Sequence, residues 1–307
     1  MRRCITTSAG QYKLSFAVSM GGMLELYDFI IYGLMAGYIA ENFFPTSDTY
    51  NSLLGTFATF AVGYITRPLG GIIFGHFGDR YGRKKSFTLS IFIMATSTAL
   101  IGCLPSYSSL GPLAPMLLVI LRCVQGFSLG GEVPGAITYL SESAPERQGF
   151  VVGILFLSLM LGVSLGTLVH GIMTLYLEES SMMGWGWRIP FWIGGLLGIV
   201  SYLIRKRFNE SGYFLALNQV RQKSSKPLYI LIRQYPRGLI CGLLIMALCG
   251  TISTVYGIYM PSYLTGLLGF PSNETAWNSS LAFLVISPVC VICGIITDIA
   301  NQYFRHF

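Results

Sequence analysis

Charged residues are scarce in this 307-residue chain, because Asp, Glu, Lys and Arg together make up only 11% of it. No charge at all occurs in four long windows, residues 86–121, 150–177, 238–273 and 275–297. A membrane-spanning helix needs only about 20 apolar residues. Hydrophobic residues form 53% of the sequence, and they lie in long runs rather than in the short alternating runs of a soluble core. The composition therefore predicts an all-α membrane protein and excludes an ordinary soluble domain.

The chain also lacks the motifs of several functional classes. It contains no nucleotide-binding glycine loop, no cluster of metal ligands and no nucleophile with a paired base. We therefore expect no enzymatic activity, no catalytic residue, no metal site and no cofactor. The net charge of +7 would suggest a nucleic-acid partner in a soluble protein. In a membrane protein the positions of Lys and Arg instead indicate the orientation of the spans, so we expect no nucleic-acid partner. The seven cysteines lie mostly in apolar segments and are interpreted as reduced packing residues.

Eight apolar segments predict eight membrane spans, and the charges between them predict their orientation. The spans are expected near residues 14–38, 52–76, 86–105, 113–140, 150–177, 188–205, 238–264 and 276–298. Lys and Arg gather in the amino tail, in residues 80–85 and in residues 205–237, which all fall on one side of this topology. The loops of the other side carry carboxylates and a single basic residue, Arg188. Because positive loops are cytoplasmic, we expect a cytoplasmic amino terminus.

The spans divide into two unequal units. We expect a six-span bundle in residues 1–205, a cytoplasmic linker in residues 206–237 and a partial second bundle, spans seven and eight, in residues 238–307. Carriers are often built from repeated halves of six spans. A weak internal echo favours this division, because Gly75-x-x-x-Asp79 after span two reappears as Gly294-x-x-x-Asp298 after span eight.

Five ionisable side chains fall inside the predicted spans, where each needs a partner or a wet cavity. They are Glu25, Asp28, Arg67, Arg122 and Glu132. Depth along the helices places Asp28 level with Arg122, and Glu25 and Glu132 nearer the cytoplasm with Arg67. Carboxyls on one helix face near an arginine can load or release a proton when their pairing changes. Structural ion pairs that pin the helices together are the open alternative.

Several long motifs, in order along almost the whole chain, resemble the major facilitator superfamily. GHFGDRYGRKKS at 75–86 is similar to the superfamily signature between spans two and three. GGMLELYDFIIYG at 21–33 resembles the first-span E-W-Y-D-F pattern of the metabolite:proton symporters, with Leu26 in place of Trp. RCVQGFSLGGEVPGAITYLSESAPERQGF at 122–150 resembles the fourth span and the loop after it. That branch includes proline/betaine, α-ketoglutarate, citrate and shikimate carriers, and the resemblance implies the transporter fold, with the second bundle truncated.

The resemblance also implies two functional groups of residues. Proton coupling would rest on Asp28 paired with Arg122, with Glu25 and Glu132 as further candidates. Asp79 would face the amino end of a helix in the second half, where a negative charge is favoured. A cytoplasmic gate would be formed by Gly75, Gly78, Asp79, Arg80, Gly82, Arg83, Glu142, Glu146 and Arg147.

The expected function is proton-coupled symport of a small polar organic solute in a bacterial inner membrane. Its partners would be the solute, protons and the lipid bilayer. Aromatic side chains suit the ammonium group of an osmolyte such as proline or betaine, and arginines suit a carboxylate. The substrate-binding candidates are Tyr27, Tyr32, Arg67, Gln125, Tyr256 and Tyr259. The alternative is a non-transporting truncated remnant of such a symporter, because family members have twelve spans.

Overall fold

Helices form nearly all of the part of the chain that the structure describes. The computed structural model describes residues 8–46, 48–207, 232–266 and 268–305, and these contain no β-strand. Most of the expected linker, residues 208–231, lies outside the described residues. The long helices are α1 (Ser8–Leu34), α3 (Thr49–Tyr81), α4 (Arg83–Cys103), α6 (Leu113–Ser143), α7 (Gln148–Tyr176), α9 (Ile189–Lys206), α12 (Pro236–Thr254) and α14 (Ser272–Arg305). The short ones are α2 (Ala36–Phe43), α5 (Tyr107–Leu110), α8 (Glu179–Gly184), η1 (Gly186–Arg188), the π-helical η2 (Val255–Tyr259) and α13 (Met260–Gly266).

The predicted spans are confirmed by the helices. In the described residues seven helices are long and apolar enough to cross a membrane. An eighth span results if α1 and α2 are counted together, although they are bent by 62° where they meet. The first predicted span is therefore broken near its end rather than straight.

The predicted second and third spans leave residues 77–85 as a loop, but only one of these residues lies outside a helix. Helix α3 continues to Tyr81 and α4 begins at Arg83. Only Gly82 lies between them, with φ 112°, a conformation that glycine adopts without a Cβ penalty. The charged residues there are compatible with a helix, so α3 continues past the apolar segment. Helix α14 likewise reaches Arg305, beyond the predicted end at residue 298.

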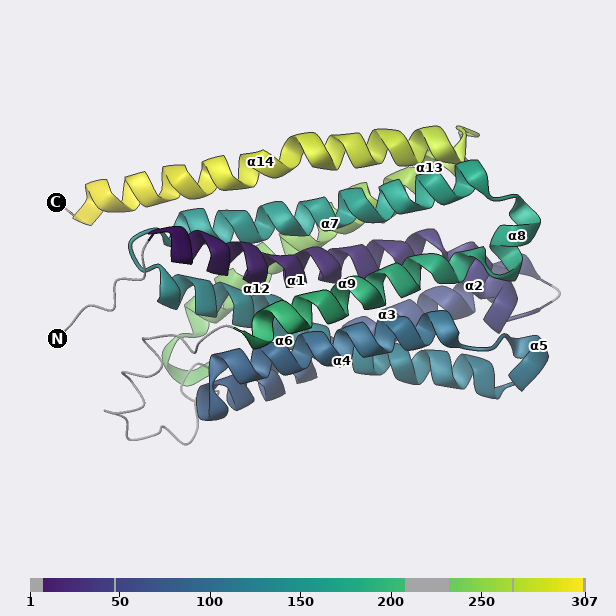
Figure 1. Ribbon diagram of the computed structural model, residues 1–307, viewed down its shortest axis with the longest axis horizontal. Coiled ribbons are helices and arrows are strands. Elements are labelled where there is room, and N and C mark those ends of the chain that lie inside the picture. The colour runs from purple at the N-terminus through teal and green to yellow at the C-terminus, as the bar shows by residue number, and fades with distance from the viewer. Residues whose placement is uncertain (1–7, 47, 208–231, 267, 306–307) are drawn as a thin grey trace.

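The long helices run along one common direction (Figure 1). Helix α14 packs along α7, α3 packs along α6, and α4 packs against both α6 and α9. One end of the bundle holds the α3–α4 junction, the α6–α7 turn and the last turn of α9, with Arg83, Arg147 and Arg205, and we call it the basic end. The opposite end holds α2, α5 and α8, with Glu41 and Glu179, and we call it the acidic end. The loops that were predicted to be basic and those that were predicted to be acidic thus lie at opposite ends of the bundle.

Arg188 is the basic residue that departs from this charge pattern, and its contacts account for its position. Its guanidinium donates hydrogen bonds to the carbonyls of Leu104, at 2.5 Å, and Gly102, at 3.3 Å. Gly102 lies in the last turn of α4 and Leu104 follows its last residue, so both carbonyls are at the helix end, where acceptors are left unsatisfied and cations are favoured.

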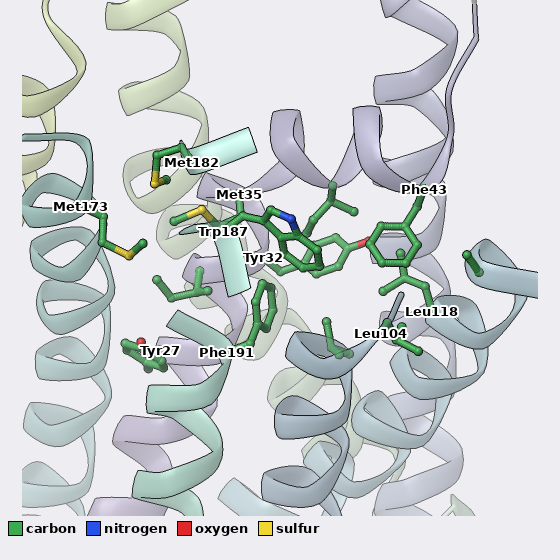
Figure 2. Close-up of a cluster of buried hydrophobic side chains, with 14 residues drawn as sticks. Tyr27, Tyr32, Met35, Phe43, Leu104, Leu118, Met173, Met182, Trp187 and Phe191 are labelled. Carbon is green, nitrogen blue, oxygen red and sulfur yellow. The ribbon is translucent and has the colours of Figure 1, made fainter. Parts of the chain in front are cut away.

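The largest buried cluster lies toward the acidic end (Figure 2). Trp187 is fully buried and packs edge-on against Phe43 of α2 and Phe191 of α9, with ring centroids 5.6 and 6.0 Å apart. Met35 and Met182 fill the space beside Trp187. This cluster joins the bent α1–α2 elbow to the α8–α9 segment and fixes that end of the bundle.

Helix α12 exposes apolar side chains. Leu243, Leu244 and Ile245 are exposed by 60–65%, and they lie in the part of α12 that carries no charge, residues 238–254. Such a surface is stable only in contact with lipid or other apolar surface. The exposure therefore supports a membrane setting for this part of the chain.

Glycines allow α3 and α6 to touch along their backbones. A Cβ on Gly126 would overlap the carbonyl oxygen of Gly63, and one on Gly130 would overlap that of Arg67. Close backbone approach through small residues is the common packing mode of membrane helices.

Gly130→Ala is therefore expected to lower the free energy of unfolding by about 1–3 kcal/mol, because the added methyl group forces α3 and α6 apart. Gly135→Ala is the matched control on the same helix, since a Cβ at Gly135 would meet no atom within 4 Å. Denaturant unfolding in detergent micelles measures both variants. Equal stability of the two variants would contradict this packing.

Candidate functional site

A polar network surrounds Asp28 in the middle of the bundle. Asp28 is 3% exposed, and its Oδ2 accepts hydrogen bonds from Thr98 Oγ1 and, at 3.0 Å, from Gln125 Nε2. Gln125 Nε2 also lies 2.8 Å from Thr98 Oγ1. The other carboxylate oxygen, Oδ1, is buried and has no hydrogen-bond partner among the described residues. The network therefore joins α1, α4 and α6 at one carboxyl group that keeps one oxygen free.

Arg122 reaches Asp28 only through Gln125. Its Nη1 donates to Gln125 Oε1, and its guanidinium lies 3.9 Å from the ring centroid of Tyr32 and 5.2 Å from that of Phe60. In the described part of the chain, no ion pair within 4.0 Å joins Arg122 to a carboxylate. The expected direct pair of Asp28 and Arg122 is thus bridged, because Gln125 lies three residues along the same helix face.

Glu25 and Arg67 form a second pair, one turn from Asp28 on α1. Their atoms Oε1 and Nη1 are 3.6 Å apart. The Arg67 guanidinium also covers the ring of Tyr64 at 4.5 Å. Arg67 and Arg122 both line a central cavity of about 10 Å³, which has room for roughly one water molecule. The two cations therefore face the same small space at the centre of the bundle.

Depth along the helices predicted that Glu132 would lie with Arg67. In the structure Glu132 instead forms an ion pair with Arg205. Glu132 Oε1 lies 2.5 Å from Arg205 Nη1, and Glu132 Oε2 accepts a hydrogen bond of 2.7 Å from Ser90. Arg205 is 1% exposed and also donates to the Val18 carbonyl at 2.7 Å. The sequence analysis placed Arg205 among the charges of the cytoplasmic loop, because a basic residue at the end of a span is usually exposed. Its burial could not be predicted from that position.

The substrate-binding candidates fall into three environments. Arg67 and Gln125 line the central cavity. Tyr27 and Tyr32 are buried in the large cluster and do not line it; their hydroxyls donate to the carbonyls of Pro190, at 2.9 Å, and Thr56, at 3.3 Å.

Tyr256 and Tyr259 lie in the third environment, in the π-helical turn η2, and are exposed by 58% and 57%. Single π-helical turns are rare and often mark functional sites. This turn interrupts the seventh span beside α1, where Gly257 approaches Ile30. No sequence pattern predicted the interruption.

At the basic end, the expected gate residues surround Arg83. Arg83 Nη2 lies 3.0 Å from Glu142 Oε1 and 3.4 Å from Asp79 Oδ1. Arg80 covers the ring of Tyr81 at 5.5 Å. Gly82 separates the two helices, and Gly78 of α3 lies beside Ser86 of α4. The remaining members of the expected gate are Gly75 on α3 and the exposed Glu146 and Arg147 in the turn before α7.

The internal echo has a structural counterpart in Asp298. Its carboxylate accepts hydrogen bonds from the amides of Gly149, at 2.7 Å, and Phe150, at 2.8 Å. These amides belong to the first turn of α7, where donors are otherwise unsatisfied and negative charge is favoured. A Cβ on Gly149 would overlap the Gly294 carbonyl oxygen, so both glycines of this contact let α14 approach α7. The repeated Gly-x-x-x-Asp spacing singled out Asp298 in the sequence, but it did not indicate that α7 is the helix that Asp298 contacts.

Asp298→Ala is expected to loosen the start of α7. Loss of a capping carboxylate costs about 1 kcal/mol, and 1.4 kcal/mol corresponds to a tenfold change in an opening equilibrium. We expect hydrogen exchange of the Gly149 and Phe150 amides to accelerate about fivefold. Asp79→Ala, which removes a partner of Arg83, is the control and should leave these amides unchanged. Unchanged exchange in Asp298→Ala would show that the cap contributes nothing to this turn.

The long apolar helices, their exposed apolar surface and the buried charges at their centre define a multi-pass membrane protein. The major facilitator superfamily model matches residues 18–306. The chain belongs to this superfamily.

Individual relatives are similar at moderate identity. A "Putative proline/betaine transporter" of Staphylococcus haemolyticus (strain JCSC1435) is 32% identical over 288 residues, which cover 93% of this chain and 62% of the relative. "Alpha-ketoglutarate permease" of Escherichia coli (strain K12) is 34% identical over 281 residues, 91% of this chain and 64% of the relative. "Inner membrane metabolite transport protein YhjE" of Escherichia coli (strain K12) is 32% identical over 93% of this chain and 66% of the relative.

Among solved structures, the proton:xylose symporter XylE bound to 6-bromo-6-deoxy-D-glucose shares the fold. The TM-score is 0.70 at 16% identity, and the match covers 94% of this chain and 69% of that chain. The chain thus spans about three-fifths to two-thirds of the length of the curated relatives it matches.

Proposed function

We propose that the protein is a proton-coupled secondary transporter of a small polar organic solute. The observation that carries this proposal is the buried carboxyl of Asp28, which has hydrogen-bonding partners on two other helices and one unpartnered oxygen. A carboxyl group in such a place exchanges a proton when its partners move. Transport by rocking bundles supplies that movement.

The relatives support the solute class of this proposal. By their printed names they carry proline/betaine, α-ketoglutarate or other metabolites. A proton symporter shares the fold. We propose a zwitterionic osmolyte or a carboxylate as the solute, bound where Arg67, Arg122 and Gln125 line the central cavity once movement of the helices has widened it. Tyr256 and Tyr259 of η2 do not line this cavity and stay candidates for a later contact with the solute.

We further propose that the basic end is cytoplasmic and that the membrane is a bacterial inner membrane. Basic loops stay on the cytoplasmic side during insertion. In this orientation Arg83, with Asp79 and Glu142, forms an ion-pair network that holds the bundle closed on the inside. The division into residues 1–205, 206–237 and 238–307 accompanies this proposal, with the two bundles moving about the linker.

Reconstituted uptake tests the function. Proteoliposomes that contain the purified chain are given an inside-alkaline pH gradient with radiolabelled glycine betaine, proline or α-ketoglutarate. We expect accumulation of at least one solute that a protonophore abolishes. No accumulation of any of them would favour the alternative, a non-transporting member of the superfamily.

A further inference from the structure

A second cavity lies at the acidic end, apart from the central one. Its volume is about 320 Å³, and it is bounded by the α1–α2 elbow, α7, α8, α13 and the start of α14. It shares no lining residue with the central cavity. Ligand pockets of proteins span about 300–1,000 Å³, so this space suits a small solute.

The charges around this cavity have one sign. Glu41 of α2 and Glu179 of α8 both line it, and none of its described lining residues is Lys or Arg. The Tyr38 side chain, also in the lining, lies beside Glu179. Two carboxylates beside an aromatic ring form a surface that attracts a cation and repels an anion.

A buried histidine in the same lining lacks a partner. His170 of α7 is 7% exposed, and its Nδ1 has no hydrogen-bond partner among the described residues. Buried polar atoms are nearly always hydrogen-bonded, so an unpartnered one calls for an explanation. His170 takes no part in the Asp28, Glu25 or Glu132 contacts described above. Hydroxyl groups of Thr167 and Ser279 also line the cavity.

We propose that this cavity binds a small solute that carries an ammonium group. The cationic group lies toward Glu41 and Glu179, and the polar remainder lies toward His170 and the hydroxyls of Thr167 and Ser279. Its place at the end opposite Arg83 makes it an outer site that a solute meets before the central cavity. That a solute meets this site first rests on the proposed transport function. The site also narrows the proposed substrate, because it favours an amino acid or betaine over a dicarboxylate.

Direct binding tests this site without transport. Radiolabelled glycine betaine is titrated onto the purified chain in detergent, with tetramethylammonium and α-ketoglutarate as competitors. We expect saturable binding that tetramethylammonium displaces and α-ketoglutarate does not. Because Glu41 and Glu179 are exposed, the double variant E41Q/E179Q keeps the fold and is expected to bind at least tenfold more weakly. E274Q, an exposed carboxylate of α14 outside the lining, is the matched control and should bind as the original chain does.

Central-site variants separate the two proposals. In R67M/R122M, betaine binding at the acidic end is expected to persist while uptake is lost. If betaine does not bind, or if E41Q/E179Q and H170A both bind it as tightly as the original chain, the outer site is refuted. Uptake of any solute under a pH gradient would in that case still uphold the transport function. Displacement by α-ketoglutarate as strong as that by tetramethylammonium would refute the ammonium preference.

Discussion

Asp28→Asn is expected to abolish solute accumulation driven by a pH gradient and to leave solute exchange across the membrane intact. Asparagine preserves the size of the side chain and an oxygen that accepts from Thr98 or Gln125, so the network at the centre of the bundle persists. It removes the one carboxyl group of that network and with it the group that, in the proposed mechanism, exchanges the proton. Uptake under a pH gradient and counterflow exchange in the same proteoliposomes measure the two activities separately.

Glu274→Gln provides the control for this variant, because Glu274 is an exposed carboxylate of the first turn of α14, far from the network in the chain. Its accumulation and exchange should match those of the original chain. Accumulation that survives in Asp28→Asn would remove Asp28 from the coupling mechanism. Loss of both accumulation and exchange would show instead that Asp28 supports the structure or the binding of the solute.

Glu132→Gln is expected to lower the free energy of unfolding by about 3–5 kcal/mol. Removing one partner of a buried ion pair leaves the other charge uncompensated in a low dielectric. Arg205 would keep hydrogen bonds to the carbonyls of Val18 and Phe87 but lose its counter-ion. Gly21 leaves the space for this pair, since a Cβ there would overlap both side chains. Denaturant unfolding in micelles measures the change.

The double variant Glu132→Gln/Arg205→Met is the control for that loss. Replacing both members of a buried pair by groups of similar shape is often nearly neutral. We therefore expect the double variant to recover most of the stability that Glu132→Gln loses. A single variant as stable as the original chain, or a double variant less stable than the single one, would contradict the buried pair.

Sequence reasoning predicted the helices well because the apolar windows are long and the signal of hydrophobicity is local. Whether a charge interrupts a helix is not a local matter. Residues 77–81 were expected to form a loop but continue α3, because polar residues beyond an apolar segment are as compatible with a helix as with a turn. The bend between α1 and α2 was also missed, since it depends on the packing of Met35 and Phe43 around Trp187.

The buried charges were found from sequence, but their partners were not. Depth along a helix places Asp28 and Arg122 at one level, yet it cannot show that Gln125 lies between them. Glu132 was assigned to Arg67 because the alternative partner, Arg205, ends a span and resembles an ordinary loop charge. Thr98 and Ser90 carry no sequence signal, because a hydroxyl in an apolar helix usually bonds to its own backbone.

The proposed coupling of solute to protons at Asp28 is tested most directly by measuring proton movement. Proteoliposomes with a pH-sensitive dye trapped inside receive glycine betaine, proline or α-ketoglutarate without an imposed gradient. We predict acidification of the interior on addition of the transported solute by the original chain, and none by Asp28→Asn. Solute uptake with no change of internal pH, or equal acidification by both proteins, would contradict proton coupling at this carboxyl.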